Sequence, residues 1–235
     1  MGSRRVLFVY GSETGQTQAE VKQILKGWEG RGLGKVTVDQ KVGNDIAKEL
    51  DFSEIKEKYD VILVGTSSFG DGDPPRGFDK FLGKLYAARR SADPQPLAGM
   101  EHCVLGFGST DYPTFQNCPR LTDRLLEEAG ARRFLQRVEV DDNEKEAVIR
   151  GKVKAWEEKV FDFLQAPKGS DTKAVCPWTE PASQIEERDV STGSLASSGS
   201  GPNWMMIVLL VAAAFAFAVN QGIIPREMLP SWLPL

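Results

Sequence analysis

The stretch Val61-Ile-Leu-Val-Gly-Thr-Ser-Ser-Phe-Gly-Asp-Gly-Asp-Pro-Pro75 decides the fold class. Its first four residues are all apolar, which is typical of a strand buried on both faces of a parallel sheet. A loop of small polar residues follows directly, and open α/β sheets bind their ligands at the carboxyl ends of such strands. Because Gly70 and Gly72 can adopt positive φ and Phe69 offers a flat apolar face, we expect a planar ligand to lie against this loop.

Apolar runs that alternate with helical patterns extend the sheet on both sides. Strands are predicted at Arg5–Tyr10, Lys35–Val42, Val61–Val64, His102–Gly108 and Arg133–Val140. One helix is expected to open at Pro75, and the last, over Glu144–Leu164, to place Val148 on its apolar face. Five strands alternating with helices indicate an α/β fold with a doubly wound parallel sheet. In the order 2-1-3-4-5, strands one, three and four are neighbours, so the loops that follow them meet at one edge.

The loops after the first and fourth strands are also polar. Gly11-Ser-Glu-Thr-Gly-Gln-Thr17 precedes a helical pattern, and hydroxyl and backbone N–H groups at a helix N-terminus suit a phosphate. This loop matches neither the Gly-x-Gly-x-x-Gly nor the Walker pattern, and an ordinary helix cap is the alternative. Ser109-Thr-Asp-Tyr-Pro-Thr-Phe-Gln-Asn-Cys118 follows the fourth strand.

Composition excludes several functions. A formal net charge of −4 argues against nucleic-acid binding, which needs a basic face. Cys103, Cys118 and Cys176 form no metal-ligand spacing with the single histidine, His102, so we expect reduced thiols in a cytosolic setting and no metal site. His102 opens an apolar strand and is expected to be structural.

Composition changes after residue 165. Residues 166–203 are rich in Ser, Gly and Pro and predict a flexible linker, with an end-to-end distance of roughly 35 Å. The apolar island Val175–Trp178 within it either packs on the domain or docks elsewhere. Residues 204–224 are apolar and predict a transmembrane tail anchor, with a buried helix as the alternative, and residues 225–235 form a short tail.

We expect a single-pass protein with its domain in the cytosol. The nearly neutral tail favours the endoplasmic reticulum over the mitochondrial outer membrane.

Taken together, the three loops resemble the flavodoxin family, and specifically the FMN domain of diflavin reductases such as NADPH–haemoprotein reductases and methionine synthase reductase. Gly11–Thr17 resembles the FMN phosphate loop, while Thr66–Pro74 and Gly106–Asn117 resemble the two loops around the isoalloxazine ring. The similarity covers about residues 4–165, so we assign residues 1–165 to a flavodoxin-like FMN-binding domain.

The resemblance implies FMN as the cofactor, and no catalytic side chain. Phe69 and Tyr112 would sandwich the ring, and the carbonyl of Gly70 would turn toward ring nitrogen N5 when the flavin is protonated, which favours the semiquinone. Asp141 would close the site, with Asp142 nearly as good a match. The implied FMN-binding residues are Ser12, Glu13, Thr14, Gly15, Gln16, Thr17, Ser67, Ser68, Phe69, Gly70, Phe107, Gly108, Ser109, Thr110, Asp111, Tyr112, Phe115, Gln116 and Asp141.

The expected function is that of a membrane-tethered FMN electron carrier. Diflavin reductases continue into an FAD- and NADPH-binding module, whereas here a linker and an apolar segment follow. We therefore expect electrons to come from a separate flavoprotein reductase and to pass to a haem protein or another acceptor. Asp71, Asp73, Asp141, Asp142 and Glu144 form either an acidic rim for a basic partner or a merely solvated rim. The alternatives are a self-contained NAD(P)H-dependent flavin oxidoreductase of the quinone-reductase type and a non-redox scaffold.

Overall fold

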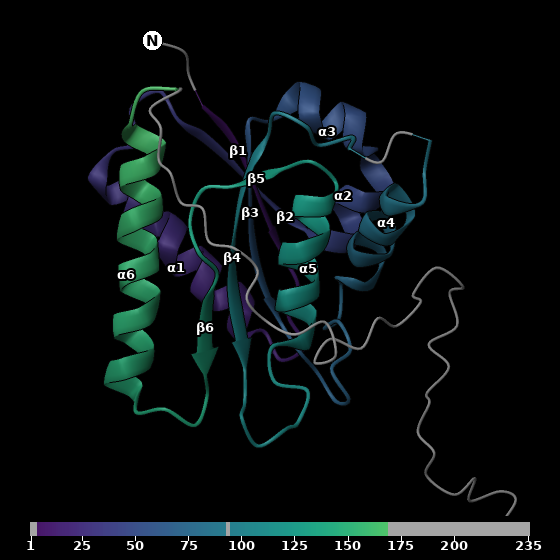
Figure 1. Ribbon diagram of the computed structural model, residues 1–235. Helices are drawn as coiled ribbons and strands as arrows, with labels where there is room; N and C mark the ends of the chain where they lie inside the picture. Colours follow the sequence, from purple (N-terminus) through teal and green to yellow (C-terminus); the bar gives the residue numbers. More distant parts are fainter. Residues whose placement is uncertain (1–3, 93–94, 169–235) are drawn as a thin grey trace, which may run out of the picture. The chain divides into compact units, whose positions relative to one another are not determined.

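The computed structural model describes residues 4–92 and 95–168 (Figure 1). The predicted transmembrane segment 204–224, the tail 225–235, the island Val175–Trp178 and the linker beyond residue 168 lie outside the described residues. Within the described ranges, no helix has both the length and the apolar character needed to cross a membrane.

Strands and helices alternate along most of the described chain. The strands are β1 (Arg5–Tyr10), β2 (Thr37–Val42), β3 (Val61–Ser67), β4 (Glu101–Gly108), β5 (Arg132–Arg133) and β6 (Val138–Asp141). The helices are α1 (Gln16–Arg31), α2 (Gly43–Glu49), α3 (Phe52–Lys58), α4 (Asp79–Arg89), α5 (Asn117–Glu128) and α6 (Glu146–Gln165).

The strands form one parallel sheet, which confirms the predicted doubly wound fold. Its order is β2-β1-β3-β4-β5, and β6 pairs with the carboxyl-terminal half of β4. The apolar run Val61–Val64 of β3 lies in the centre of the sheet, where Val64 is in register with Val9 of β1 and Val104 of β4. All strands point the same way, so their carboxyl ends, and the loops that follow them, gather at the lower edge of Figure 1.

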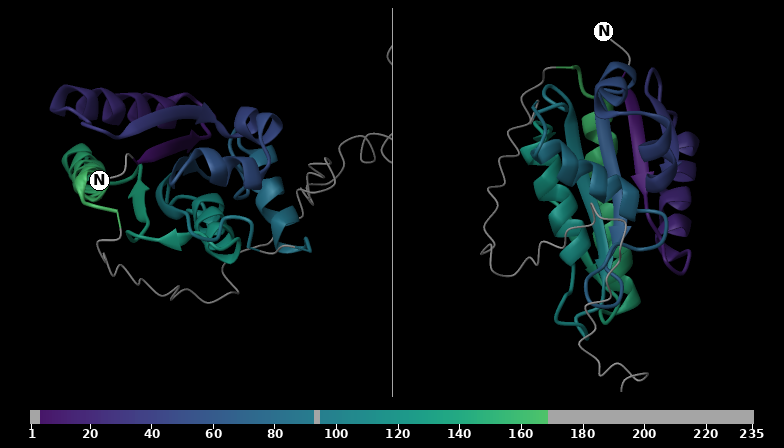
Figure 2. Two further views of the ribbon diagram at one scale, coloured as in Figure 1. Left: turned by 90° about the horizontal axis from the view of Figure 1, so that it is seen from above. Right: turned by 90° about the vertical axis from the view of Figure 1, so that its right-hand side faces the viewer.

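Each face of the sheet carries its own hydrophobic core, because successive side chains of a strand point to opposite faces. On one face Phe8 and Leu63 pack with the helices α1 and α6, which contribute Trp28 and Trp156. On the other face Leu7 and its neighbours pack against α2 to α5. Figure 2, left, shows α1 and α6, in purple and green, together on one side of the sheet.

The prediction of a single fifth strand over Arg133–Val140 was wrong. The segment is divided into β5, which pairs with the start of β4, and β6, which pairs with its end. The register shifts by two residues between the two pairings, from Glu101↔Arg132 to Leu105↔Val138, so the connecting segment is two residues longer than the stretch of β4 beside it. Phe134 stacks on Phe163 of α6 at a centroid distance of 3.7 Å, and Arg137 reaches Asp123 of α5 at 2.8 Å. With this extra length, residues 134–137 leave the strand ladder between β5 and β6.

Two details of the predicted helices also differ. The helix after β3 begins at Asp79 and not at Pro75, because Gly77 has φ 81°, outside the helical region, and a turn closes from Phe78 N to Pro75 O. In α6, Val148 is 44% exposed rather than buried. The helix starts at Glu146, two residues later than expected, so Val148 lies in its first turn beyond the edge of the core.

Candidate functional site

A cavity of about 400 Å³ opens at the carboxyl edge of the sheet, where the loops after β1, β3, β4 and β6 meet. This is within the size range of small-molecule sites. Its walls are formed by Ser12, Glu13, Thr14, Gln16, Thr17, Ser67, Ser68, Phe69, Gly70, Phe107, Gly108, Ser109, Tyr112, Thr114, Phe115 and Asp142.

The loop after β1 presents the N-terminus of α1 to the cavity. Gly15 is the N-cap residue in the left-handed conformation, with φ 92°, and its N–H donates to Ser12 Oγ at 3.0 Å. No acidic residue occupies the first turn of α1, so its positive dipole end is not neutralised from within the helix. The Glu13 carboxylate accepts the backbone N–H of Arg76 at 2.8 Å, which ties the loop to the segment after β3. A rigid loop of hydroxyl and N–H donors is suited to hold a phosphate.

The loop after β3 is a closed turn that turns Phe69 outward. Phe69 and Asp73 exchange backbone hydrogen bonds of 2.9 and 2.8 Å, and Gly70 and Gly72 between them have φ values of 52° and 90°. Thr114 Oγ1 donates to the Gly70 carbonyl at 3.3 Å, which fastens this turn to the loop after β4. Both aromatic loops are therefore joined to each other around the cavity.

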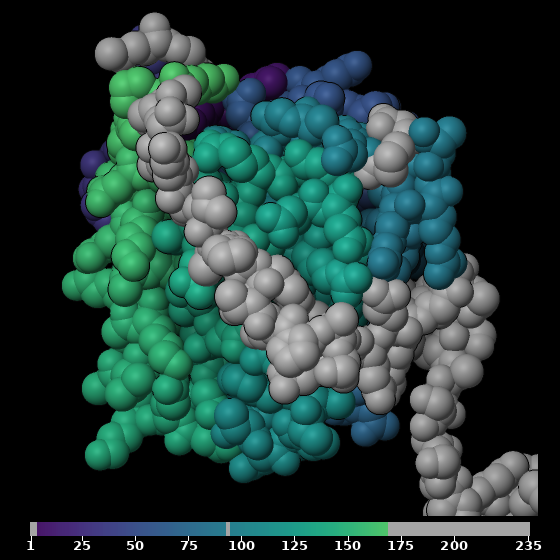
Figure 3. All heavy atoms as spheres, in the orientation of Figure 1, coloured from purple at the N-terminus to yellow at the C-terminus, as the bar shows by residue number. Residues whose placement is uncertain are grey.

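The two aromatic rings of the cavity are unusually exposed. Phe69 is 53% and Tyr112 57% exposed, and in the described ranges only Val148 is a further large exposed hydrophobic residue. The loop between β4 and α5, in teal, protrudes at the lower edge in Figure 3. Flat apolar faces that line a cavity but are left open to water fit a planar aromatic ligand, which would bury them.

Two consecutive carboxylates at the end of β6 differ in their surroundings: Asp141 is the last residue of the strand, and Asp142 directly follows it. Asp142 lines the cavity and accepts Gln16 Nε2 at 3.4 Å. Burial and the neighbouring charge of Asp141 raise the pKa of Asp142 above its ordinary value. Asp141 instead accepts hydrogen bonds from Thr110 and Asn143, which outweigh burial and lower its pKa. The cavity lining contains no Lys, Arg or His, so an anionic ligand there would be held by neutral donors.

Most of the residues predicted for the site line this cavity, but five do not: Gly15, Thr110, Asp111, Gln116 and Asp141. Gly15 and Thr110 instead make hydrogen bonds within the chain, Gly15 to Ser12 and Thr110 to Asp141. Gln116 is fully buried at the N-cap of α5 with φ 62°, and its Nε2 donates to Val140 O at 3.0 Å. Thr114 lines the cavity although it was not singled out, and Asp142 takes the place given to Asp141. The ligand contacts of all these residues stay predictions.

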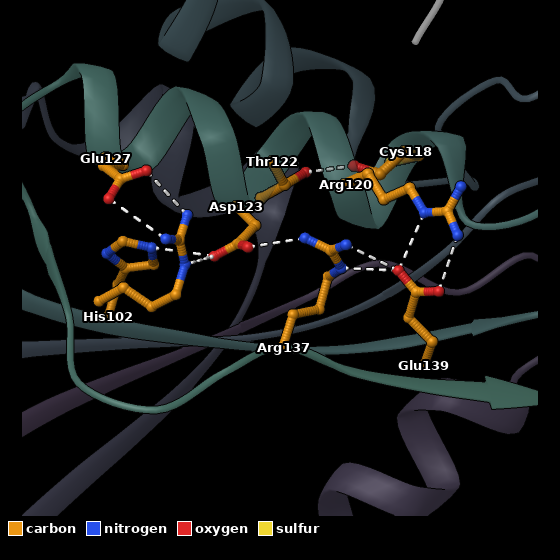
Figure 4. Close-up of polar contacts among 9 residues, drawn as sticks. His102, Cys118, Arg120, Thr122, Asp123, Glu127, Arg137 and Glu139 are labelled. Carbon is orange, nitrogen blue, oxygen red and sulfur yellow. Dashed lines mark hydrogen bonds and ion pairs between the residues drawn. The ribbon is translucent and has the colours of Figure 1, made fainter. Parts of the chain in front are cut away.

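The histidine and the described cysteines are not part of the cavity lining, although the Cys118 N–H donates to Ser68 Oγ of the lining at 2.9 Å. His102 is buried and its Nε2 is 3.1 Å from Asp123 Oδ1, in a polar network beneath α5 (Figure 4), which agrees with a structural role. Cys103 and Cys118 are free and buried; burial raises the pKa of both thiols, that of Cys118 to about 12. Within residues 4–92 and 95–168, no group of His, Cys, Asp or Glu side chains could hold a metal ion. The hydroxyl groups beside the N-terminus of α1 and the two exposed aromatic rings make this cavity suited to a flat, phosphorylated molecule.

Comparison with known proteins finds relatives over the same part of the chain. The family model described as Flavodoxin matches residues 8–156. Methionine synthase reductase of Caenorhabditis elegans is 32% identical over 158 residues, which is 67% of this chain but 21% of that protein. NADPH–cytochrome P450 reductase of Candida tropicalis is 26% identical over 192 residues, 82% of this chain and 26% of that protein. The chain thus matches only about a fifth to a quarter of the length of these curated relatives.

Solved structures give the same fold. A flavodoxin of Streptococcus pneumoniae TIGR4 superposes with a TM-score of 0.51 at 26% identity, covering 68% of this chain and 99% of that one. A cysteine-to-serine mutant of flavodoxin from Pseudomonas aeruginosa gives a TM-score of 0.53 at 20% identity, covering 69% and 99%, which supports the fold alone.

Proposed function

Because this chain belongs to the flavodoxin family, we propose that it is a membrane-tethered FMN electron carrier. It takes electrons from a separate flavoprotein reductase and passes them to a haem protein or another redox acceptor. The single observation that carries this proposal is the cavity, in which a phosphate loop at the N-terminus of α1 and two exposed aromatic rings line one space.

The cofactor is FMN, and the residues present suit its parts. Ser12, Thr14 and Thr17 offer hydroxyl groups for the phosphate beside the N-terminus of α1. Phe69 and Tyr112 offer apolar faces for the ring. When bound, FMN supplies reversible one-electron transfer, and the protein contributes binding, orientation and electrostatics.

The side chains of the site perform no bond-breaking step. The phosphate loop anchors one end of the ligand, and the aromatic loops cover the ring and exclude water from its faces. No cation lines the cavity, so the phosphate and the Asp142 carboxylate would meet no positive side chain there, whereas Glu13 is paired with Arg76 Nη2 at 3.3 Å. Such an environment disfavours additional negative charge on the ligand and thus opposes its reduction.

The carboxylates at the rim of the cavity favour docking of a basic redox partner. Fewer of them are unpaired and exposed than the sequence suggests. Asp71 is exposed at the tip of the Phe69 turn. Asp142, directly after β6, is also exposed as a residue, although the cavity wall shields part of its carboxylate from water. Glu144 is paired with Lys152 at 2.6 Å, and Asp141 is engaged by Thr110. In this proposal, the negative charge that attracts a basic partner therefore comes chiefly from Asp71 and Asp142. Complementary charges on the two surfaces would guide the partner to the rim of the cavity.

Tethering is proposed from the sequence of residues 204–224, which is long and apolar enough for a membrane anchor. An anchor behind a flexible linker raises the effective concentration of the carrier at an acceptor in the same membrane, without any new contact. In this arrangement the FMN domain faces the cytosol, at the endoplasmic reticulum.

The experiment that tests the carrier function is an absorption spectrum of the purified full-length chain in detergent, before and after incubation with FMN. We expect flavin bands at one FMN per chain. On mixing with NADPH, the flavin should stay oxidised until a flavoprotein reductase is added. A chain that neither contains nor takes up FMN would refute the proposal, and fast reduction by NADPH alone would favour a self-contained oxidoreductase.

A further inference from the structure

Asp141 lies behind the cavity wall and uses both carboxylate oxygens within the chain. Oδ1 accepts the backbone N–H groups of Thr110 and Asn143, each at 3.1 Å. Oδ2 accepts the Thr110 hydroxyl at 2.7 Å. Three donors on one carboxylate leave little capacity for a ligand.

Asn143, two residues after Asp141, also contacts the loop after β4. Asn143 Nδ2 donates to Ser109 Oγ at 3.2 Å and to Thr110 Oγ1 at 3.1 Å. Ser109 and Thr110 in turn begin the tight turn in which Tyr112 N donates to Ser109 O at 3.2 Å. The position of the Tyr112 ring therefore depends on Thr110, and Thr110 depends on Asp141.

We propose that Asp141 is a positioning residue that holds the Ser109–Phe115 loop, and so places Tyr112 against the ring of the bound flavin. This inference rests on the proposed function. Asp142, next in sequence, has the complementary place, because its side chain lines the cavity and meets Gln16 at the phosphate side. One carboxylate supports the ring side of the site, and the other faces the ligand.

The first test compares FMN with riboflavin, which lacks the phosphate, on the full-length chain carrying Asp141→Asn. Loss of the charge-assisted hydrogen bonds should weaken riboflavin about tenfold and FMN by at most the same factor, because the ring side is disturbed while one negative charge near the phosphate is removed. Ser12→Ala is the matched contrast, since a change in the phosphate loop should weaken FMN and leave riboflavin unchanged. Glu146→Gln, which removes an exposed carboxylate paired with Arg150 at 2.7 Å, should change neither affinity.

The second test needs no flavin. Hydrogen exchange of the full-length chain should show the amides of Thr110 and Tyr112 exchanging about tenfold faster in Asp141→Asn, while the Gly15 amide, bonded to Ser12 Oγ, keeps its rate. Thr110→Val, an exposed site that loses only the hydroxyl, should give a smaller change of the same kind if Asp141→Asn does not fold.

The outcomes separate this inference from the proposed function. If the Thr110 and Tyr112 amides of Asp141→Asn exchange at the wild-type rate, the role of Asp141 is refuted and the proposed function is not. The same holds if these amides exchange faster but the affinity for riboflavin is unchanged. A loss confined to FMN would make Asp141 part of the phosphate side and also overturn it. A wild-type chain that binds no flavin would overturn both.

Discussion

At the scale of single residues, Gly70 and Gly72 look equivalent in sequence but differ in their surroundings. Both have positive φ, yet a Cβ at Gly70 meets nothing within 4 Å, while one at Gly72 would lie 2.8 Å from Asn117 Nδ2 and 2.9 Å from Thr114 Cβ. Gly70→Ala should cost roughly 1–2 kcal/mol of unfolding free energy from the backbone alone. Gly72→Ala should cost about 3 kcal/mol, because overpacking adds to the strain. Urea titrations followed by tryptophan fluorescence measure both, and equal losses would contradict the difference in packing.

Asp142 should make FMN binding depend on pH. Its pKa is raised by burial and by Asp141, so its ionised form opposes folding at neutral pH, and that opposition is lost as the pH falls through the folded pKa. The same charge repels the phosphate of FMN. Asp142→Asn should therefore bind FMN several-fold tighter than wild type at pH 7.5, roughly threefold to tenfold. The gap in FMN affinity should close as the pH falls through the raised pKa of Asp142, and it should be absent for riboflavin at every pH. A constant gap would contradict titration of Asp142.

The sequence predicts which loops form the site but not the direction of every side chain. Phe69, Tyr112 and Thr17 could be placed because they follow the ends of neighbouring parallel strands. Asp141 and Asp142 are chemically identical and adjacent, and only the pairing of β6 with β4 decides which one faces the cavity. Gln116 is a similar case, since its buried position at the N-cap of α5 with φ 62° depends on the path of the preceding loop.

At the scale of elements, α5 is joined to the sheet by a buried polar network (Figure 4). Asp123, only 1% exposed, accepts His102 Nε2, Arg133 Nε at 2.9 Å and Arg137 Nη1 at 2.8 Å. Arg137 also donates to Glu139 of β6 at 2.9 Å. The network fills the interval between β5 and β6, where the sequence pattern suggested one continuous strand. Long-range partners of arginines cannot be recognised from a local pattern, and this is why the break was missed.

Removing the central carboxylate of this network should destabilise the domain strongly. Asp123→Asn removes the carboxylate that Arg133 and Arg137 share, while Arg133 keeps Glu127 and Arg137 keeps Glu139. The loss should cost about 2–3 kcal/mol, since charge-assisted hydrogen bonds are weakened but neither guanidinium is left unpaired. Burial disfavours the ionised form, but His102 and Arg133 lower the pKa of Asp123 to about 2. A depressed folded pKa stabilises above the unfolded pKa, about 3.9, and this contribution is lost as the pH falls toward 2. Urea titrations from pH 7 to pH 2.5 should show the gap between wild type and variant narrowing in that window.

The control for this prediction is Glu158→Gln in α6. Glu158 pairs with Lys154 at 4.0 Å, and both side chains are more than half exposed. Its loss should change the unfolding free energy by less than about 0.5 kcal/mol, since screened surface pairs contribute little. If both variants lose a similar amount of unfolding free energy, the buried network contributes no more to stability than an exposed ion pair.

At the scale of the whole molecule, the described FMN domain should fold and bind without the residues that follow it. All strands of its sheet and both hydrophobic clusters lie within residues 4–168. Truncation after Lys168 should therefore leave FMN affinity within about twofold, but abolish membrane association and slow reduction of a membrane acceptor by roughly 10²-fold through lost effective concentration. Ala214→Arg in the full-length chain is the matched control, because one arginine at the centre of the apolar segment 204–224 costs about 3 kcal/mol of insertion. It should behave like the truncation in membrane flotation while keeping every residue of the linker. If the intact chain and both variants float equally, or if truncation abolishes FMN binding, the division into a cofactor domain and a tether is wrong.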